Sequence, residues 1–122
     1  MSLQEQRQQH RYTIGIHTEV YRKSYNEEPI FTCKVRNIGL EGLKLPNKDL
    51  TLRIGSRLHL LLVTSGVKGR EEFRMDAKVV WKTAKDLGLS LYPLSSDEQS
   101  ALNKFLFIAK VALRSRERAR LS

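Results

Sequence analysis

The chain is poor in the residues that usually carry covalent or metal chemistry. Its 122 residues include a single cysteine, Cys33, so no disulfide can form within the chain. The three histidines, His10, His17 and His59, show no metal-ligand spacing with one another or with Cys33. Neighbouring carboxylates fall in expected turns, where nothing places a nucleophile beside a base. The sequence therefore predicts no metal site, no cofactor and no enzymatic activity.

Long apolar runs are also missing. The longest apolar stretch, LHLLLV at residues 58–63, is far shorter than the roughly 18 residues that suggest a membrane span. The N-terminal MSLQEQRQQHR is polar throughout and lacks the apolar core of a signal peptide. We therefore expect one cytoplasmic domain that is not an integral membrane protein.

Basic residues are in clear surplus. The chain has 22 lysines and arginines against 13 acidic residues, a formal net charge of +9. Such a surplus attracts anions, from nucleic acid to phosphate-bearing small molecules. Residues 110–120 hold five basic residues and one acidic residue, which leaves +4 near the C-terminus. This arginine-rich tail is expected to be a solvated face, with contact to a partner protein, an acidic membrane or nucleic acid as the alternative.

Alternation of apolar and polar residues dominates the middle of the chain and predicts strands. The expected strands cover residues 12–21, 30–36, 42–45, 56–64, 72–84 and 86–94. Six short strands linked by turns favour a closed or nearly closed antiparallel barrel. The most regular period-two run has its apolar residues at Phe73, Met75, Ala77, Val79 and Trp81. The fold class is therefore mainly β.

One helix is predicted after the strands. Ser95 and Glu98 have the spacing of a capping box, in which two side chains satisfy the first free amides of a helix. Apolar residues then recur at helical spacing, at Leu102, Phe105, Leu106, Ala109 and Leu113. We expect a flexible arm at 1–11, a barrel at 12–94, and a helix with a basic tail at 95–122, where the helix can fray or project beyond Leu113.

Two short motifs stand out at the ends of the first two expected strands. NIGLEG, residues 37–42, follows the second strand, and its asparagine and glycines suit a tight hairpin turn because both tolerate positive φ. RQQHR places Arg7 and Arg11 just before the first strand. The same arginine spacing occurs elsewhere in the chain, so only its position distinguishes this pair. In an antiparallel barrel the two motifs can be neighbours.

This pattern resembles the PilZ domain, a bacterial receptor module for the second messenger cyclic di-GMP. That family carries R-x-x-x-R before its first strand and [Asp or Asn]-x-Ser-x-x-Gly after its second, on a six-stranded barrel followed by a helix. Arg7 and Arg11 match the first motif, and Asn37 and Gly42 match the second. Gly39 stands where the family usually has serine. The resemblance covers roughly residues 7–113 and includes the VVW near residue 80.

The resemblance implies a cyclic di-GMP site formed by Arg7, Arg11, Asn37, Gly39 and Gly42. Guanidinium groups can fork onto phosphates, pair with a guanine edge or stack on a base. Asn37 would hold a guanine edge or brace the turn, and the glycines would let the backbone approach the base. Loss of the serine hydroxyl should cost about 0.5 to 1.5 kcal/mol of binding free energy.

Two other functions remain open at this stage. A PilZ-like adaptor that does not bind cyclic di-GMP would work through an unidentified downstream protein partner. The glycine at position 39, in place of the usual serine, is consistent with this alternative. A small basic barrel can also bind RNA or single-stranded DNA, although nucleic acid is not the partner that we expect. Trp81 and Tyr92 are interpreted as core or rim aromatics rather than as stacking platforms.

Overall fold

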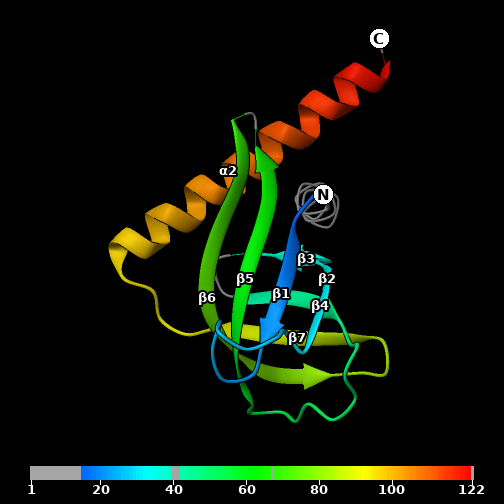
Figure 1. Ribbon diagram of the computed structural model, residues 1–122, viewed down its shortest axis with the longest axis vertical. Coiled ribbons are helices and arrows are strands. Elements are labelled where there is room, and N and C mark those ends of the chain that lie inside the picture. Colours follow the sequence, from blue (N-terminus) through cyan, green and yellow to red (C-terminus); the bar gives the residue numbers. More distant parts are fainter. Residues whose placement is uncertain (1–14, 40–41, 67, 122) are drawn as a thin grey trace, which may run out of the picture.

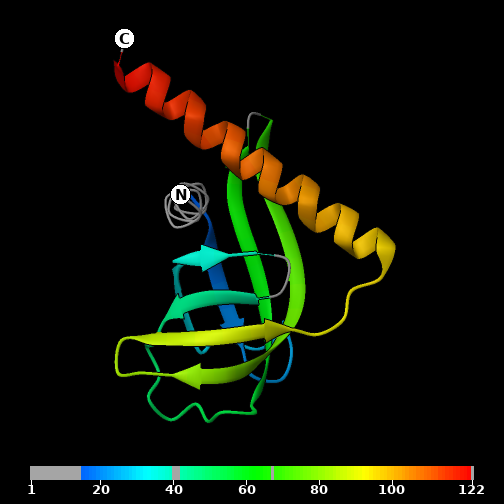
Figure 2. The ribbon, with the colours of Figure 1, turned by 180° about the vertical axis from the view of Figure 1, so that it is seen from behind.

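The computed structural model describes residues 15–39, 42–66 and 68–121, with side chains described as far as residue 111. The body is a strongly curled antiparallel sheet, and one long helix crosses a side of it (Figures 1 and 2). The C-terminal end of this helix projects past the edge of the sheet in both views. The prediction of a mainly β, barrel-like fold followed by a helix is confirmed.

The described chain contains seven strands and a helix. Their bounds are β1 (His17–Tyr21), β2 (Phe31–Lys34), β3 (Asn37–Ile38), β4 (Gly42–Pro46), β5 (Arg57–Gly66), β6 (Gly69–Lys82), β7 (Asp86–Leu91) and α2 (Ser96–Leu121). The strands form one sheet in the order β2-β1-β5-β6-β7-β4-β3. All neighbouring pairs are antiparallel.

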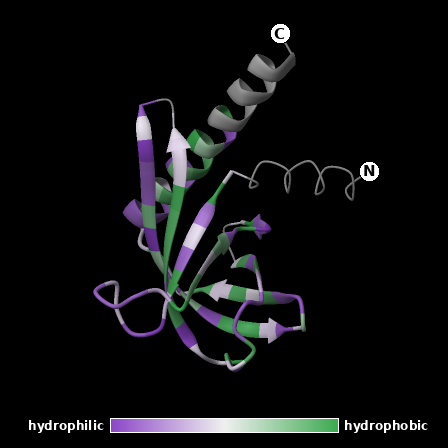
Figure 3. Cartoon of the chain, turned by 45° about the vertical axis from the view of Figure 1, so that its right-hand side comes forward, coloured by the Kyte–Doolittle hydropathy of each residue, from purple (hydrophilic) through white to green (hydrophobic). Residues whose placement is uncertain are grey.

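Alternation along the strands directs apolar side chains into the curl. Hydrophobic and hydrophilic residues take turns along the strands in Figure 3. The fully buried strand residues include Ile16, Val20, Leu58, Leu60 and Leu62, each 0% exposed. Cys33 is also buried, and burial raises the pKa of its thiol to about 11. The prediction that Cys33 is a small core residue is therefore confirmed.

The expected second strand, residues 30–36, is shorter in the structure, because β2 ends at Lys34. A further short strand, β3, follows at Asn37–Ile38, within the stretch expected to be a turn, so the described residues form seven strands rather than the predicted six. The amide of Val35 donates to the carbonyl of Ile16 at 2.8 Å, next to β1. The next amide, Arg36, donates to the carbonyl of Lys44 at 2.9 Å, next to β4. The chain thus changes partner between β2 and β3, which lie at the two ends of the sheet order. This change of partner draws the two ends of the sheet together.

The alternation along β6 fails after Val79, where a bulge shifts the register with β7. Met75, Ala77 and Val79 are buried as predicted, whereas Trp81 is 42% exposed. The extra residue, Val80, rotates the following side chain to the outer face of the sheet. Of the two positions expected for Trp81, core or rim, the exposed fraction agrees with the rim.

Helix α2 begins with the expected capping box. The amide of Glu98 donates to Ser95 Oγ at 3.1 Å, and the amide of Ser95 donates to Glu98 Oε1 at 3.0 Å. Leu102, Phe105 and Ala109 are buried against the sheet, which confirms the inward stripe at these positions. The phenyl rings of Phe73 and Phe105 lie 6.2 Å apart and tie the helix to β6.

Candidate functional site

The NIGLEG stretch forms a hairpin, as its sequence predicts. Asn37 pairs with Lys44 and Ile38 with Leu43. The amide of Gly39 donates to the carbonyl of Gly42 at 2.9 Å and closes the turn. The hairpin joins β3 to β4 and so forms the last two strands of the curled sheet.

Only one of the two glycines of this hairpin is required by the packing, and its reason differs from the one expected. Positive φ occurs in the described residues only at Gly55 and Gly69, so neither Gly39 nor Gly42 uses that freedom. A Cβ on Gly42 would lie 2.3 Å from the carbonyl oxygen of Leu89, so the approach of β7 excludes a side chain there. A Cβ on Gly39 would meet nothing within 4 Å. Gly42 is therefore structural, whereas position 39 has room for serine.

A row of four paired residues crosses the outer face of the sheet from Asn37 to Trp81. Asn37 pairs with Lys44, Lys44 with Gly88, and Gly88 with Trp81. The indole lies directly over Gly88, because a Cβ built there would be 2.0 Å from Trp81 Cε2. An exposed indole face and a lysine therefore share one surface with Asn37. We call this set, with Arg36, the cross-strand row.

The cross-strand row carries more positive than negative charge. Arg36 Nε lies 2.6 Å from Asp86 Oδ1, and Lys44 Nζ lies 3.7 Å from Asp86 Oδ2. One carboxylate thus faces two cations whose side chains remain 51% and 42% exposed. Exposed ion pairs of this kind are weak, so both cations can turn toward a phosphate group.

The first described residues, Gly15 and Ile16, lie close to the start of β3. Val35 is hydrogen-bonded to Ile16, and Asn37 follows Val35 by two residues. Arg7 and Arg11 lie outside the described residues, so their positions relative to Asn37 stay a prediction. Of the predicted site residues, the structure brings Asn37, Gly39 and Gly42 together in one hairpin.

A hollow of about 360 Å³ lies where the N-terminal segment meets β1. Its lining includes His17, Glu19, Thr32 and Arg70. Arg70 pairs with Glu72 at 2.7 Å and reaches Glu19 at 4.0 Å, so its charge is largely balanced locally.

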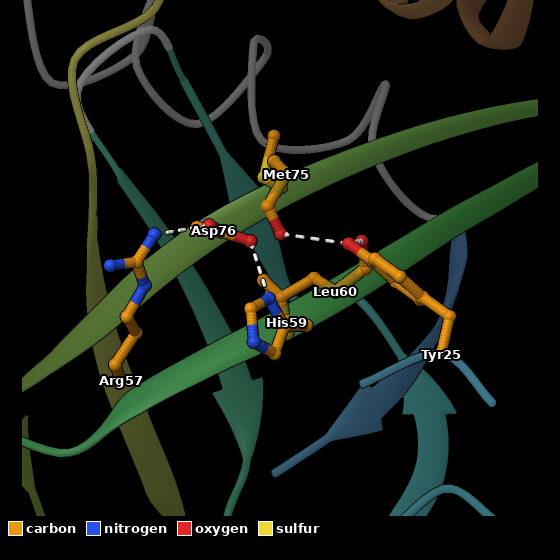
Figure 4. A network of polar contacts seen from close by, with 6 residues as sticks. All are labelled: Tyr25, Arg57, His59, Leu60, Met75 and Asp76. Atoms are coloured by element: carbon orange, nitrogen blue, oxygen red, sulfur yellow. Dashed lines mark hydrogen bonds and ion pairs between the residues drawn. The ribbon is translucent and has the colours of Figure 1, made fainter. Parts of the chain in front are cut away.

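A second polar cluster lies at the other end of β1 and stabilises the sheet (Figure 4). Asp76 accepts hydrogen bonds from Arg57 at 2.6 Å and pairs with His59 Nδ1 at 2.7 Å. Burial acts to raise the pKa of Asp76, but the contacts with Arg57 and His59 outweigh it and lower that pKa. The Tyr25 hydroxyl donates to the carbonyl of Leu60 at 3.0 Å and so ties the β1–β2 loop to β5.

Sequence analysis did not identify Trp81, Lys44 and Arg36 as candidate site residues. Trp81 was assigned to the core or rim because period-two alternation cannot reveal a bulge. Lys44 and Arg36 carry no motif, and only the pairing of β3, β4 and β7 places them beside Asn37. The one available signal was the smallness of Gly88, seven residues after Trp81, which leaves space for a large ring.

The structure is a strongly curled antiparallel sheet whose outer face carries two exposed cations and an exposed indole. In a search against family models, the model of the PilZ domain matches residues 5–107. The chain belongs to the PilZ domain family, whose members serve as receptor and adaptor domains for cyclic di-GMP. A comparison with curated protein sequences gives no match.

Three solved structures share the fold. The PilZ domain of CeSA from a cellulose-synthesizing bacterium is 13% identical, with a TM-score of 0.56, over 75% of this chain and 89% of that one. The inhibitor of motility MotI/DgrA of Bacillus subtilis is 14% identical, with a TM-score of 0.54, over 84% of this chain and 47% of that one. A tetrameric PilZ protein of Xanthomonas campestris is 22% identical, with a TM-score of 0.53, over 76% and 50%. This chain thus matches about half the length of the last two.

No helix in residues 15–39, 42–66 and 68–121 has both the length and the apolar character needed to cross a membrane.

Proposed function

We propose that the chain is a cyclic di-GMP receptor whose ligand binds over the cross-strand row. The observation that supports this most strongly is the row itself, in which Asn37, Lys44 and the indole of Trp81 share one outer surface beside the entry of the N-terminal segment. Each group suits a different part of a dinucleotide that carries two phosphates and two guanines.

The proposed roles follow from the chemistry of each side chain. Arg7 and Arg11 fork onto phosphate oxygens or a guanine edge, as the family resemblance implies. Lys44 adds a point charge for a phosphate, and the exposed face of Trp81 stacks a guanine, which is worth about 1 to 3 kcal/mol per base. Asn37 accepts from and donates to a guanine edge.

The length of the N-terminal segment is compatible with these roles. Arg11 precedes Ile16 by five residues, and an extended chain of that length spans about 17 Å. Strands lie about 4.8 Å apart, so the four strands of the row span about 14 Å. An arginine at position 11 can therefore reach across the row from the entry point beside Val35.

The signal passes to an unidentified downstream protein through a change of surface. Closing residues 1–11 over a ligand costs conformational entropy and covers one face of the barrel, which shifts the population that a partner can bind. Such a cytoplasmic receptor would regulate motility, biofilm or exopolysaccharide production, or virulence. The name of the Bacillus subtilis relative, inhibitor of motility, favours the first of these.

Titration calorimetry with cyclic di-GMP at near-physiological salt tests the proposal, with intrinsic fluorescence as a second readout. Trp81 is the only tryptophan of the chain, so a base that stacks on it must change the emission. We expect wild-type protein to bind cyclic di-GMP with micromolar or tighter affinity and to show no comparable binding of GMP. Arg11→Ala should lower the affinity for cyclic di-GMP about tenfold or more, since a charge-assisted hydrogen bond contributes about 1.5 to 3 kcal/mol.

Arg22→Ala is the matched control, because Arg22 is an exposed arginine paired only loosely with Asp49, at 3.6 Å. It should bind cyclic di-GMP as the wild type does. Absence of heat, of a melting-temperature shift and of a fluorescence change at high ligand concentration would exclude the receptor function and leave the adaptor function. Binding with an unchanged emission would retain the receptor and remove Trp81 from the site.

A further inference from the structure

Apolar side chains gather on the surface where loop 47–56 runs beside β6. Leu50 is 69% exposed, Ile54 63% and Val80 41%. The amide of Gly55 donates to the carbonyl of Val79 at 2.7 Å, and the amide of Val79 donates to the carbonyl of Ser56 at 2.9 Å. These two backbone hydrogen bonds place Ile54 beside Val80. We call Leu50, Ile54 and Val80 the loop patch; Trp81 lies next to it on the side of the cross-strand row.

The loop that carries the patch is anchored, so the exposure of its apolar residues is built into the fold. Leu52, between the two exposed residues, is 0% exposed. Lys82 Nζ donates to the carbonyls of Leu52 at 2.8 Å and Leu50 at 3.4 Å. Asp49 accepts from the amide of Thr51 at 2.9 Å. Apolar side chains held outward in this way by an anchored loop are typical of a contact site.

Positive charge surrounds the loop patch. Arg53, Lys78 and Lys85 are exposed, and none of them forms an ion pair with a residue that the structure describes. The nearby Asp49 is engaged by Thr51 and by Arg22. The patch therefore combines protruding aliphatic side chains with cations that form no ion pair among the described residues.

This combination selects among possible occupants. A second copy of the chain would bring two basic rims together, which like-charge repulsion disfavours. An anionic bilayer accepts both parts of the surface: aliphatic side chains enter the boundary between headgroups and acyl chains, and lysines and arginines contact lipid phosphates. The loop also lies at the edge of the molecule opposite the C-terminal end of α2, where a flat surface can reach it (Figures 1 and 2).

We propose that the loop patch and its basic rim form a docking surface for an anionic lipid bilayer. Leu50 and Ile54 insert at the interface, and Arg53, Lys78 and Lys85 hold anionic headgroups. This contact is peripheral and independent of the cyclic di-GMP site, because it uses none of the residues of the cross-strand row.

Co-sedimentation of the full chain with phosphatidylcholine vesicles, with and without phosphatidylglycerol, tests the proposal. We expect binding that requires phosphatidylglycerol. The double variant Leu50→Ser/Ile54→Ser should lower the partition coefficient about tenfold or more. Phe107→Ser is its control, because Phe107 is 60% exposed on α2, away from the loop. Both variants should keep the wild-type melting temperature, since the substituted side chains are exposed.

Two charge variants separate the contribution of the basic rim to vesicle binding from that of the overall net charge. Arg53→Gln/Lys85→Gln should weaken binding about tenfold or more, since each cation near an anionic surface contributes about 1 kcal/mol. Lys23→Gln/Lys104→Gln removes the same charge elsewhere and should have a much smaller effect. If the protein does not co-sediment with vesicles that contain phosphatidylglycerol, the lipid assignment is overturned. This outcome covers the case in which an acidic protein is the true partner of the patch. Equal losses in the two charge variants, with none in the loop variant, overturn it as well.

Discussion

At the scale of single residues, three glycines illustrate how different structural reasons can look alike in sequence. Gly42 leaves room for the carbonyl of Leu89, and Gly88 leaves room for the indole of Trp81. Gly39 faces open space. The first two are therefore required by close packing, whereas no packing contact among the described residues requires the third.

Substitution of Gly42 and Gly39 by alanine should separate these reasons. Gly42→Ala should lower the free energy of unfolding by about 1 to 3 kcal/mol, because a Cβ would push β4 away from β7. Gly39→Ala should change it by less than about 0.5 kcal/mol, as an exposed position without packing constraints does. Urea titration followed by circular dichroism measures both. Equal effects would show that the hairpin does not approach β7 as described.

Gly39→Ser restores the residue that the PilZ motif usually has. The site has space for the side chain, and one added neutral hydrogen bond is worth about 0.5 to 1.5 kcal/mol. We expect the affinity for cyclic di-GMP to rise about two- to tenfold, measured by titration calorimetry. Gly39→Ala is the matched control and should leave the affinity unchanged. A lower affinity in the serine variant would place the ligand too close to position 39 for any side chain.

At the scale of elements, the start of α2 is determined by local sequence, whereas the bulge in β6 is not. The capping box of α2 lies within four consecutive residues, Ser95 to Glu98, and both of its hydrogen bonds are present. The bulge of β6 depends on how Val79 and Trp81 pair with β7, a strand whose register is also constrained by β4. Local signals therefore predict where the helix begins but not where the strand alternation changes.

Ser95→Ala tests the contribution of the cap. Removing an N-cap hydroxyl typically costs about 1 kcal/mol, because an amide of the first helical turn loses its acceptor. We expect a loss of that size in thermal unfolding. Ser100→Ala, an exposed position inside the helix, is the control and should be neutral or slightly stabilising. A neutral Ser95→Ala would mean that solvent caps the helix equally well.

At the scale of the whole molecule, the sheet curls because residues 35 and 36 change partner between its two ends. The amide of Val35 donates to the carbonyl of Ile16, just before β1, and the amide of Arg36 donates to Lys44 in β4. Strands β1 and β4 stand far apart in the sheet order. The same step places Asn37 near the entry of the N-terminal segment. Closure of the barrel and assembly of the candidate site are therefore consequences of one change of partner.

Acid should destabilise the fold through Asp76, which joins β5 and β6. Its pKa is lowered in the folded state, so the unfolded state binds more protons in acid. The resulting stabilisation is complete above the unfolded pKa, near about 4, and is lost as the pH falls through the folded value.

Asp76→Asn should remove this component of the pH dependence. At neutral pH the variant should lose about 1 kcal/mol, since partly exposed ion pairs are worth about that much or less. Melting temperatures recorded from neutral to acid pH for wild type and variant test this. Parallel curves for the two proteins would show that Asp76 is not the group that titrates on unfolding.

The sequence alone determined the features that depend on neighbouring residues. Alternation predicted most strands and the buried Met75, Ala77 and Val79, helical spacing and the cap predicted α2, and two motifs indicated the PilZ family. These signals arise from local geometry, with a period of two in strands and of 3.6 in helices.

Tertiary structure alone decided which outward side chains meet. The division of β2 from β3, the outward turn of Trp81 onto Gly88, and the placing of Lys44 beside Asn37 all depend on hydrogen-bond register between strands distant in sequence. A shift of one residue in such a register moves a side chain to the other face of the sheet. The register is set by packing of the whole barrel, because local periodicity does not specify which strands pair.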